Sequence, residues 1–573
     1  MLKIYLLSSA FNGFTQKVFT ILGPEFDVKV GLALNDEMII SDINEFNPSV
    51  VICPYLKDRI PEVVWEKFLC LIIHPGIVGD RGPSSLDWAI LEEQSNWGVT
   101  ALEASEEMDA GDIWATESFP MQKRRKSFIY NRLVTEAGLK VIRTFLERYI
   151  KGNEKAIPSE AFSNESKGTL KPLMTQNDRR IFWDRDSGSD IIRKINASDG
   201  FPGVLCTLLD EDVFLYDAHL ETQLKHDTPG QVIGRCNEGI CISTTDGAIW
   251  VTHLKRKKTD DKKHFKVPAS LLLADHLISV PDFDFCPFQE TPSKPDWQDI
   301  RYEESGSTGV LSFDFYNGAM NTSQCVRLAS ALTLALKRKT ETLILRGGDI
   351  FWSNGINLNT IEYADSPAEE AWKNICEMDN LIEIILKATD KLTIAVIEGN
   401  AGAGGVFLAL ACDRVYMSES GILNPHYKTM GLFGSEFWTL TLPRRVGSHM
   451  ADYLTKACPP VNARQALKIN LIDGLIYHDK SVDSEISEFL EGLSQDRSEI
   501  LDKKKLALEQ TSLAKVKDYE LAQMRMNFFS NNLNFTEKRK RFVFKEKPQK
   551  FCQPSKVWEY FSDQDQSRSR SLR

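Results

Sequence analysis

The stretch that decides the fold is LIIHPGIVGDRGPSSLDW, residues 71–88, where an apolar run leads directly into a Pro-Gly turn. The apolar residues predict the end of a buried strand, and His74 follows them where the strand stops. In a sheet of parallel strands, side chains at the carboxyl ends line the ligand site. We therefore expect an imidazole at the edge of such a sheet, in position for general acid–base chemistry.

The first 150 residues around this stretch alternate between strand and helix patterns. VTEAGLKVIRTFLERYI (134–150) has the spacing of an amphipathic helix. This alternation predicts a parallel sheet with helices on both faces. The G-x-G-x-x-G fingerprint is absent after the first strand, so we expect no nicotinamide cofactor. The expected strands are LKIYLLS (2–8), DVKVGLAL (27–34), SVVICPYL (49–56) and FLCLIIHPG (68–76).

Three further regions follow. Short strands broken by turns at about 175–280 predict a small β-barrel. Strand–helix alternation returns at about 310–475, and the region from about 485 is charged and helical. The fold class is therefore α/β multidomain: a Rossmann-like domain, a small β-barrel and a second α/β domain with a helical C-terminal region. The expected boundaries are 1–165, 170–285, 300–480 and 485–560.

Composition narrows the function classes. The chain has 573 residues, which suggests three to four domains at about 150 residues each. Its formal net charge of −11 argues against a nucleic-acid partner. The eleven cysteines form no C-x-x-C pair and the nine histidines show no ligand spacing, so we expect no metal site. No apolar run is long enough for a membrane span or a signal peptide, and we expect a cytoplasmic protein.

An acidic residue accompanies the histidine. Asp109 lies 35 residues after His74, in MDAGDI, between a strand and the next element. An acid near the imidazole would fix its tautomer, although the two residues could instead satisfy a turn and cap one. With DGFPG at 199–203, the first 280 residues resemble the 10-formyl-tetrahydrofolate-dependent formyltransferases. The resemblance implies that His74 and Asp109 polarise the formyl carbonyl and shuttle the proton.

One position departs from that pattern. Formyltransferases usually carry Asn two residues before the histidine, where its amide stabilises the tetrahedral oxyanion, and Ile72 stands there in this chain. Loss of one oxyanion donor costs about 100- to 1,000-fold in rate. Either another donor substitutes, or the acceptor is not the usual amine. A thiolate acceptor attacks readily and would depend less on a donor that stabilises the oxyanion.

Two glycine-bearing segments mark the second α/β domain: FWSNGINLN (351–359) and IEGNAGAGGVFLALACDRV (397–415). Glycines permit close backbone approach, and two backbone N–H groups on one oxygen make an oxyanion hole. In this order the segments resemble the crotonase, or enoyl-CoA hydratase, superfamily over about 310–475. The resemblance implies that Ile356 and Gly404 donate the two N–H groups and that Gly355 and Gly405 contact an acyl-CoA.

The glutamates of the hydratases are missing, so addition of water to a double bond is not expected. Phe407 and Tyr427 stand in their positions. Tyr427, in LNPHYKTMG, is either a proton carrier or a packed phenol. Glu436, in GLFGSEFW, either supplies a different catalytic carboxylate or caps a helix N-terminus.

The fusion of these two parts resembles the HypX (HoxX) family, which assists NiFe-hydrogenase maturation by making a carbon monoxide ligand. The resemblance implies formyl transfer from 10-formyl-tetrahydrofolate to coenzyme A, followed by decarbonylation of formyl-CoA. NiFe-hydrogenase maturation proteins would be further partners. Leu440 departs from a Tyr of that family. The expected CoA contacts are Gln16, Arg132, Ser198 and Arg541, each of which could equally be a surface group.

Other possibilities remain open at this point. A hydrolase that passes through formyl-CoA would release formate with the same two sites. A folate- or CoA-binding scaffold without catalysis would be consistent with Ile72 and Phe407 in place of polar groups. The basic runs QKRRK (122–126) and KRKKTDDKKH (255–264) are expected to be solvated surfaces.

Overall fold

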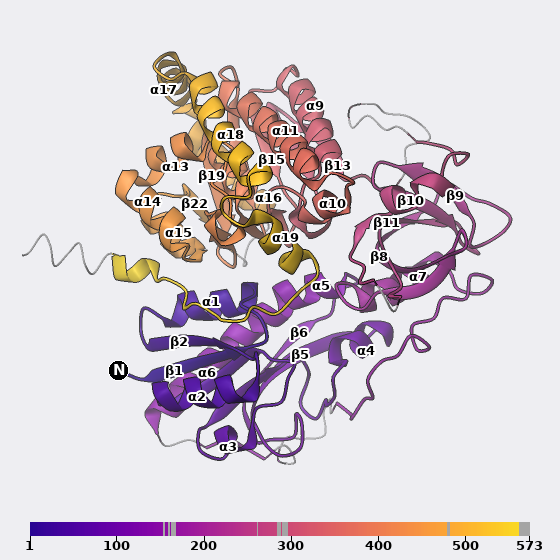
Figure 1. Ribbon diagram of the computed structural model, residues 1–573, viewed down its shortest axis with the longest axis vertical. Coiled ribbons are helices and arrows are strands. Elements are labelled where there is room, and N and C mark those ends of the chain that lie inside the picture. Colours follow the sequence, from indigo (N-terminus) through magenta and orange to yellow (C-terminus); the bar gives the residue numbers. More distant parts are fainter. Residues whose placement is uncertain are drawn as a thin grey trace, which may run out of the picture. The chain divides into compact units, whose positions relative to one another are not determined.

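The computed structural model describes residues 1–152, 155–158, 161, 168–259, 262–283, 288, 296–477 and 482–560 (Figure 1). The chain forms two compact units. The first unit takes in Met1–Asp284 with Pro295–Trp297 and Lys547–Gln553, and the second unit takes in the rest. None of the helices in the described residues is long and apolar enough to cross a membrane.

The first unit begins with a six-stranded sheet in the order β2-β1-β3-β4-β5-β6. Its strands form where the apolar runs lie, and Ile4, Leu6 and Leu7 of the first strand are fully buried. The strands are β1 (Lys3–Ser8), β2 (Asp27–Leu32), β3 (Val50–Tyr55), β4 (Cys70–His74), β5 (Asn96–Glu103) and β6 (Ile113–Pro120). The helices are α1 (Gly13–Leu22), α2 (Asp36–Phe46), α3 (Glu62–Trp65), α4 (Ser85–Leu91), α5 (Lys126–Ile129), the π-helical turn η1 (Tyr130–Val134) and α6 (Thr135–Lys151).

The expectation of a fully parallel sheet was wrong for its last two strands. β1, β2, β3 and β4 pair in parallel, whereas β4 pairs antiparallel with β5 and β5 antiparallel with β6. No helix lies between β5 and β6, so the chain lacks the crossover that a parallel pair needs. The four strands that predicted the site are still parallel, and His74 ends the last of them.

An antiparallel sheet completes the first unit, in the region where a small β-barrel was expected. Its order is β7-β8-β11-β10-β9, with β12 paired to β11. A helix, α7 (Gly188–Ser198), precedes it and buries Ile191 and Ile195. The strands are β7 (Val204–Leu208), β8 (Glu211–Glu221), β9 (Val232–Cys236), β10 (Gly239–Ser243), β11 (Ala248–Arg256) and β12 (Val267–Pro268), followed by α8 (Ala269–Leu272) and η3 (Ala274–His276).

A segment from late in the sequence, Lys547–Gln553, belongs to this first unit. It contacts β2, which is an edge strand of the six-stranded sheet. The Gln553 side chain accepts a hydrogen bond from the Val30 N–H at 2.9 Å and donates one to the Val30 carbonyl at 2.5 Å. The Phe551 ring packs edge-on against Phe11. The Gln553 side-chain amide therefore forms hydrogen bonds with the Val30 backbone groups on the outer side of this edge strand.

The second unit contains an α/β region, as the renewed strand–helix alternation predicted, and its strands form two sheets. The larger sheet has the order β13-β14-β15-β17-β19-β22, and the smaller has the order β16-β18-β20-β21. The larger consists of β13 (Ile300–Ser305), β14 (Thr308–Phe313), β15 (Thr342–Arg346), β17 (Leu392–Ile397), β19 (Arg414–Ser418) and β22 (Gly474–Ile476). The smaller consists of β16 (Phe351–Ser353), β18 (Asn400–Gly402), β20 (Ile422–Asn424) and β21 (Val461–Asn462).

Helices pack around these sheets and bury a large apolar core, beside a smaller apolar cluster that includes Ile344, Val396 and Ile486. The largest members of the core include Phe313, Trp352 and Phe407, all almost fully buried. The helices beside the sheets are α9 (Thr322–Leu336), α10 (Leu358–Tyr363), α11 (Pro367–Lys387), α12 (Gly404–Leu410), α13 (Trp438–Val446), α14 (Ser448–Ala457) and α15 (Ala463–Lys468), with the 3-10 turns η4 (Tyr316–Gly318) and η5 (Lys428–Met430). The expected helical C-terminal region contains α16 (Val482–Ser494), α17 (Arg497–Glu509), α18 (Leu513–Phe529) and α19 (Phe535–Val543).

Candidate active sites

A cavity of about 1250 Å³ lies in the first unit, at the carboxyl ends of β3 and β4. Apolar walls with a few converging polar groups are typical of small-molecule sites. His74 and Asp109, the two catalytic candidates of this unit, both line it, and so do Lys126, Arg179 and Phe201. The cavity is large enough for a folate-sized ligand.

His74 is flanked by two carboxyl groups. Its Nδ1 lies 3.5 Å from Asp109 Oδ1, as the sequence led us to expect. Its Nε2 lies 2.9 Å from Asp80 Oδ2, a contact that sequence reasoning missed. The signal was present, because Asp80 follows His74 by six residues in the turn after the strand. The side chains of His74 and Asp80 are only 4% and 3% exposed.

Ile72 also lines the cavity. Its hydrocarbon side chain has no donor for an oxyanion. The departure from the formyltransferase pattern is therefore a real feature of the cavity wall.

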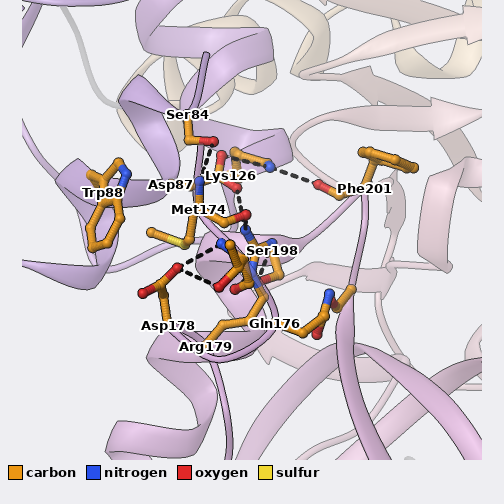
Figure 2. Close-up of polar contacts among 12 residues, drawn as sticks. Ser84, Asp87, Trp88, Lys126, Met174, Gln176, Asp178, Arg179, Ser198 and Phe201 are labelled. Carbon is orange, nitrogen blue, oxygen red and sulfur yellow. Dashed lines mark hydrogen bonds and ion pairs between the residues drawn. The ribbon is translucent and has the colours of Figure 1, made fainter. Parts of the chain in front are cut away.

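Beside His74, the cavity wall contains a buried ionic cluster centred on Asp87, shown in Figure 2. Lys126 Nζ lies 2.9 Å from Asp87 Oδ2 and donates to the Phe201 carbonyl at 2.8 Å. Arg179 Nη2 lies 3.5 Å from Asp87 Oδ1, and Arg179 Nη1 donates to the Ser198 hydroxyl at 3.1 Å. Burial lowers the pKa of Lys126, and the neighbouring Asp87 opposes that shift.

Two residues of the run at 122–126 correct the expectation that this run is a solvated surface. The Lys126 side chain is 18% exposed, and Arg125 is paired with the buried Asp217 of β8. They connect the α/β part of the unit to its antiparallel sheet. Sequence alone could not reveal this, because both acidic partners lie far from the run along the chain.

The residues expected to contact CoA occupy different surroundings. The Gln16 amide donates to the Phe11 carbonyl at 2.9 Å, and Arg132 Nε lies 4.0 Å from Glu136 Oε1. Arg541, in the second unit, pairs with Glu537 at 2.6 Å. Burial and the charge of Arg132 lower the pKa of Lys17 to about 7, so a second cation lies beside Arg132.

Ser198 is fully buried, and its hydroxyl donates to the Lys194 carbonyl while accepting from Arg179. This environment argues against a phosphate contact at Ser198. The roles of the four residues toward CoA remain predictions.

In the second unit, the two glycine-bearing segments meet as expected. The Met320 N–H donates to the Gly355 carbonyl and the Asn357 N–H donates to the Met320 carbonyl, at 2.9 and 3.0 Å. Ile356 lies between the two residues that bond to Met320, so its own N–H points away from Met320. A Cβ on Gly355 would stand 3.1 Å from the Gly404 nitrogen. The backbone groups predicted to form the oxyanion hole therefore lie on adjacent segments.

The glycines at the start of α12 permit close packing. A Cβ on Gly404 would stand 1.9 Å from Glu436 Oε1, and one on Gly405 would stand 2.0 Å from the Ser353 carbonyl oxygen. Before them, Ala403 has φ 47° and ψ −130°, a conformation that non-glycine residues rarely adopt. Strain of this kind is typical of functional sites.

Tyr427 and Glu436 form a buried pair at this point. The Tyr427 hydroxyl donates to Glu436 Oε2 at 2.7 Å, and the Phe407 ring stacks on Tyr427 with centroids 5.3 Å apart. Burial and the nearby Glu436 raise the pKa of Tyr427. Burial and then the charge of Asp379 raise the pKa of Glu436. Both groups therefore hold protons strongly beside Gly404.

The structure corrects the suggestion that Glu436 caps a helix. The N-terminus of α13 is capped instead by Glu520 of α18, which accepts from the N–H groups of Phe437 and Thr439, both at 2.8 Å. Asp379 of α11 accepts from the Glu436 N–H at 2.7 Å. Burial raises the pKa of Glu520 to about 7 and also raises the pKa of Asp379.

Comparison with known proteins identifies both parts of the chain. The enoyl-CoA hydratase/isomerase family model matches residues 309–553, and the formyl transferase C-terminal domain model matches residues 173–266. The chain is also similar to methionyl-tRNA formyltransferase of a Sulfurihydrogenibium species, with 24% identity over 38% of this chain and 69% of that protein. The chain thus combines a formyltransferase-type part with an enoyl-CoA hydratase-type part.

Similarity to two proteins extends over nearly the whole length. Hydrogenase maturation factor HoxX of Bradyrhizobium diazoefficiens is 38% identical over 95% of both chains. The crystal structure of HypX from Aquifex aeolicus in complex with tetrahydrofolic acid is 40% identical, covers 96% of this chain and 97% of its own, and has a TM-score of 0.90. The chain belongs to the HoxX/HypX family of hydrogenase maturation factors. The resemblance and fold class inferred from the sequence are confirmed.

Proposed function

We propose that this protein makes carbon monoxide from 10-formyl-tetrahydrofolate through formyl-CoA, in the cytoplasm, and supplies it for NiFe-hydrogenase maturation. The observation that carries the proposal is the buried Tyr427–Glu436 pair beside Gly404. A hydratase would need carboxylates to add water, and Phe407 stands where one is expected. A chain of this family with a dry proton-carrying pair is suited to decarbonylation.

The first step belongs to the cavity around His74. The CoA thiol attacks the formyl carbon, the bond from that carbon to N10 of the folate breaks, and N10 receives a proton. His74 and Asp109 line the cavity and lie within 3.5 Å of each other, so they can hold and pass that proton. Ile72 supplies no donor for the oxyanion, which favours a thiolate over an amine as the acceptor. The similar HypX crystal structure in complex with tetrahydrofolic acid supports folate binding by this chain.

The second step belongs to the Tyr427–Glu436 pair. Formyl-CoA has no α-carbon, so it cannot form the enolate on which ordinary crotonase chemistry depends. In decarbonylation the C–H and C–S bonds of the formyl group break, carbon monoxide leaves and the proton returns to sulfur. The N–H groups of Ile356 and Gly404 would hold the thioester oxygen. A carboxyl group with a raised pKa is a strong base when ionised, and Tyr427 hydrogen-bonds to it directly.

A hydrolase that releases formate is the second candidate, because it would use the same two sites. Exclusion of water distinguishes the two: Phe407 is fully buried and stacks on Tyr427, leaving no polar group in the position of the hydratase glutamate. A scaffold without catalysis would not need a strained backbone at Ala403 or a paired Tyr and Glu beside it.

Product analysis tests the proposal. The full chain is incubated without oxygen with 10-formyl-tetrahydrofolate and CoA, and haemoglobin traps carbon monoxide while formate is assayed in parallel. Carbon monoxide formed in step with tetrahydrofolate supports the proposal. Formate alone would assign hydrolysis to the second unit. Neither product, with tetrahydrofolate still bound, would support the scaffold.

A further inference from the structure

We infer that Asp80 is a positioning residue that keeps a proton on His74 Nε2 and thereby leaves Nδ1 as the nitrogen that exchanges a proton during formyl transfer. The inference deepens the proposed function of the first unit and rests on it. Nothing in the formyltransferase resemblance assigns a role to this position.

Asp80 Oδ2 has two partners. It lies 2.9 Å from His74 Nε2, and it accepts a hydrogen bond of 2.6 Å from the Ser85 hydroxyl at the start of α4. Ser85 Oγ also lies 2.9 Å from the Pro75 carbonyl. An ionised carboxylate can only accept hydrogen bonds, so the ring must supply the hydrogen at Nε2. Because all three side chains are buried, the ring is held in this orientation.

The two nitrogens of His74 face different surroundings. His74 and Asp109 line the cavity, whereas Asp80 is not among the residues that line it. The distance from Nδ1 to Asp109 Oδ1 is 3.5 Å, longer than an N–H···O hydrogen bond. Nε2 is therefore held by its hydrogen bond to Asp80, whereas Nδ1, on the Asp109 side, is the nitrogen that a substrate group can approach.

A glycine makes this arrangement possible. A Cβ on Gly76 would stand 2.4 Å from His74 Nε2 and 2.3 Å from Asp80 Oδ2, between the two hydrogen-bonded groups. Any side chain at this position would separate the ring from the carboxylate. The Pro-Gly turn after β4 therefore serves the pairing of His74 with Asp80 as well as the direction of the chain.

The proton balance of the reaction fits one reacting nitrogen. The thiol loses its proton as sulfur bonds to the formyl carbon, and N10 of the folate gains a proton as its bond to that carbon breaks. His74 Nδ1, next to Asp109, takes up the first proton and returns it. Throughout, the hydrogen stays on His74 Nε2 and is donated to Asp80, as in the buried Asp–His pairs of hydrolases, where the acid fixes the tautomer.

The test combines kinetics with histidine ¹⁵N NMR on the full chain. Asp80→Asn should lower kcat for formyl transfer by at least about 100-fold, because the tautomer is no longer fixed. The KM for 10-formyl-tetrahydrofolate should change little, since Asp80 lies outside the cavity lining. In the NMR spectrum, the His74 signals, assigned by their loss in His74→Gln, should change from an Nε2-protonated pattern to a mixture.

A milder variant and a control keep the test informative if Asp80→Asn folds poorly. Ser85→Ala retains the carboxylate but removes one donor, and it should give a smaller loss of kcat than Asp80→Asn. Glu45→Gln, on the exposed side of α2, should leave both measurements unchanged.

An unchanged kcat or an unchanged His74 spectrum in well-folded Asp80→Asn would overturn the inference. If the wild-type chain transfers no formyl group but the spectrum responds to Asp80, the proposed function fails while the tautomer assignment stands.

Discussion

The Tyr427 hydroxyl donates a hydrogen bond of 2.7 Å to Glu436, and the two residues are only 5% and 1% exposed. They come from different loops, one before η5 and one before α13. Glu436 Oε1 lies close to the Cα of Gly404, whose N–H group is one of the two predicted oxyanion-hole donors. The pair therefore joins a phenol, a carboxyl group and the start of α12 in one buried site.

Removing the phenol tests this site directly. Tyr427→Phe keeps the ring that stacks on Phe407 but removes the hydroxyl, and carbon monoxide formation should fall about 100-fold for loss of a proton carrier. Formyl-CoA should accumulate, because the first unit is untouched. Haemoglobin-bound carbon monoxide and formyl-CoA are measured together. Tyr416→Phe is the matched control, because that ring is also buried and stacked, on Phe489. Equal carbon monoxide rates in wild type and Tyr427→Phe would remove Tyr427 from the mechanism.

Adding one methyl group should separate the two reactions. In Gly404→Ala the new Cβ would stand 1.9 Å from Glu436 Oε1, so the carboxyl group must move. We expect carbon monoxide formation to be lost while formyl-CoA is still made. Gly492→Ala is the control, because a Cβ there meets nothing within 4 Å and should stabilise α16 by about 0.5–1 kcal/mol. A Gly404→Ala chain that makes carbon monoxide at the normal rate would contradict this placement of Glu436.

Opening space beside Tyr427 should change the product. Phe407→Leu removes the stacked ring and leaves room for water, at a cost of about 1–3 kcal/mol in the free energy of unfolding. The ratio of formate to carbon monoxide should rise, since hydrolysis needs the water that the ring excludes. The two products are assayed from one reaction. Phe313→Leu removes another buried ring of the same core and should lower stability without changing the ratio.

The buried acids predict how stability depends on pH. Burial raises the pKa of Glu520 to about 7, so the folded unit binds a proton that the unfolded chain has released above about pH 4.5. The free energy of unfolding of the second unit should therefore fall as the pH rises from about 4.5 to 7, by up to about 1.4 kcal/mol per pH unit for one proton. Urea unfolding at several pH values measures this slope.

Glu520→Gln should flatten the slope, and Glu509→Gln, on the exposed face of α17, should leave it as it is. A slope of the same size in Glu520→Gln and the wild-type chain would show that another group takes up the proton.

Local patterns predicted most of the fold and the centre of each site. His74 could be found because a strand pattern stops there, and Gly404 because two glycine-bearing segments occur in a specific order. β5 and β6 were not predicted as an antiparallel pair, since alternation alone does not report the missing crossover helix. Asp379 and Glu520 reach Glu436 from α11 and α18, and no spacing along the sequence reveals contacts over that separation.

Positions inside a motif were missed for a different reason. Asp80 was within the quoted stretch, but its pairing with His74 depends on how tightly the turn closes at Gly76. Lys126 was expected in solvent because a run of basic residues usually is, and only the tertiary fold supplies Asp87 and the Phe201 carbonyl.

The pairing of Gln553 with Val30 has a consequence for solubility. An edge strand offers free backbone groups to any other extended chain, and proteins cover such edges to prevent sheet-to-sheet aggregation. Here an amide side chain takes the place of a neighbouring strand at β2, without adding a strand that could itself recruit another. A chain that stopped before Lys547 would keep the residues of both candidate sites but would expose this strand edge. We expect such a chain to self-associate before it loses catalytic activity.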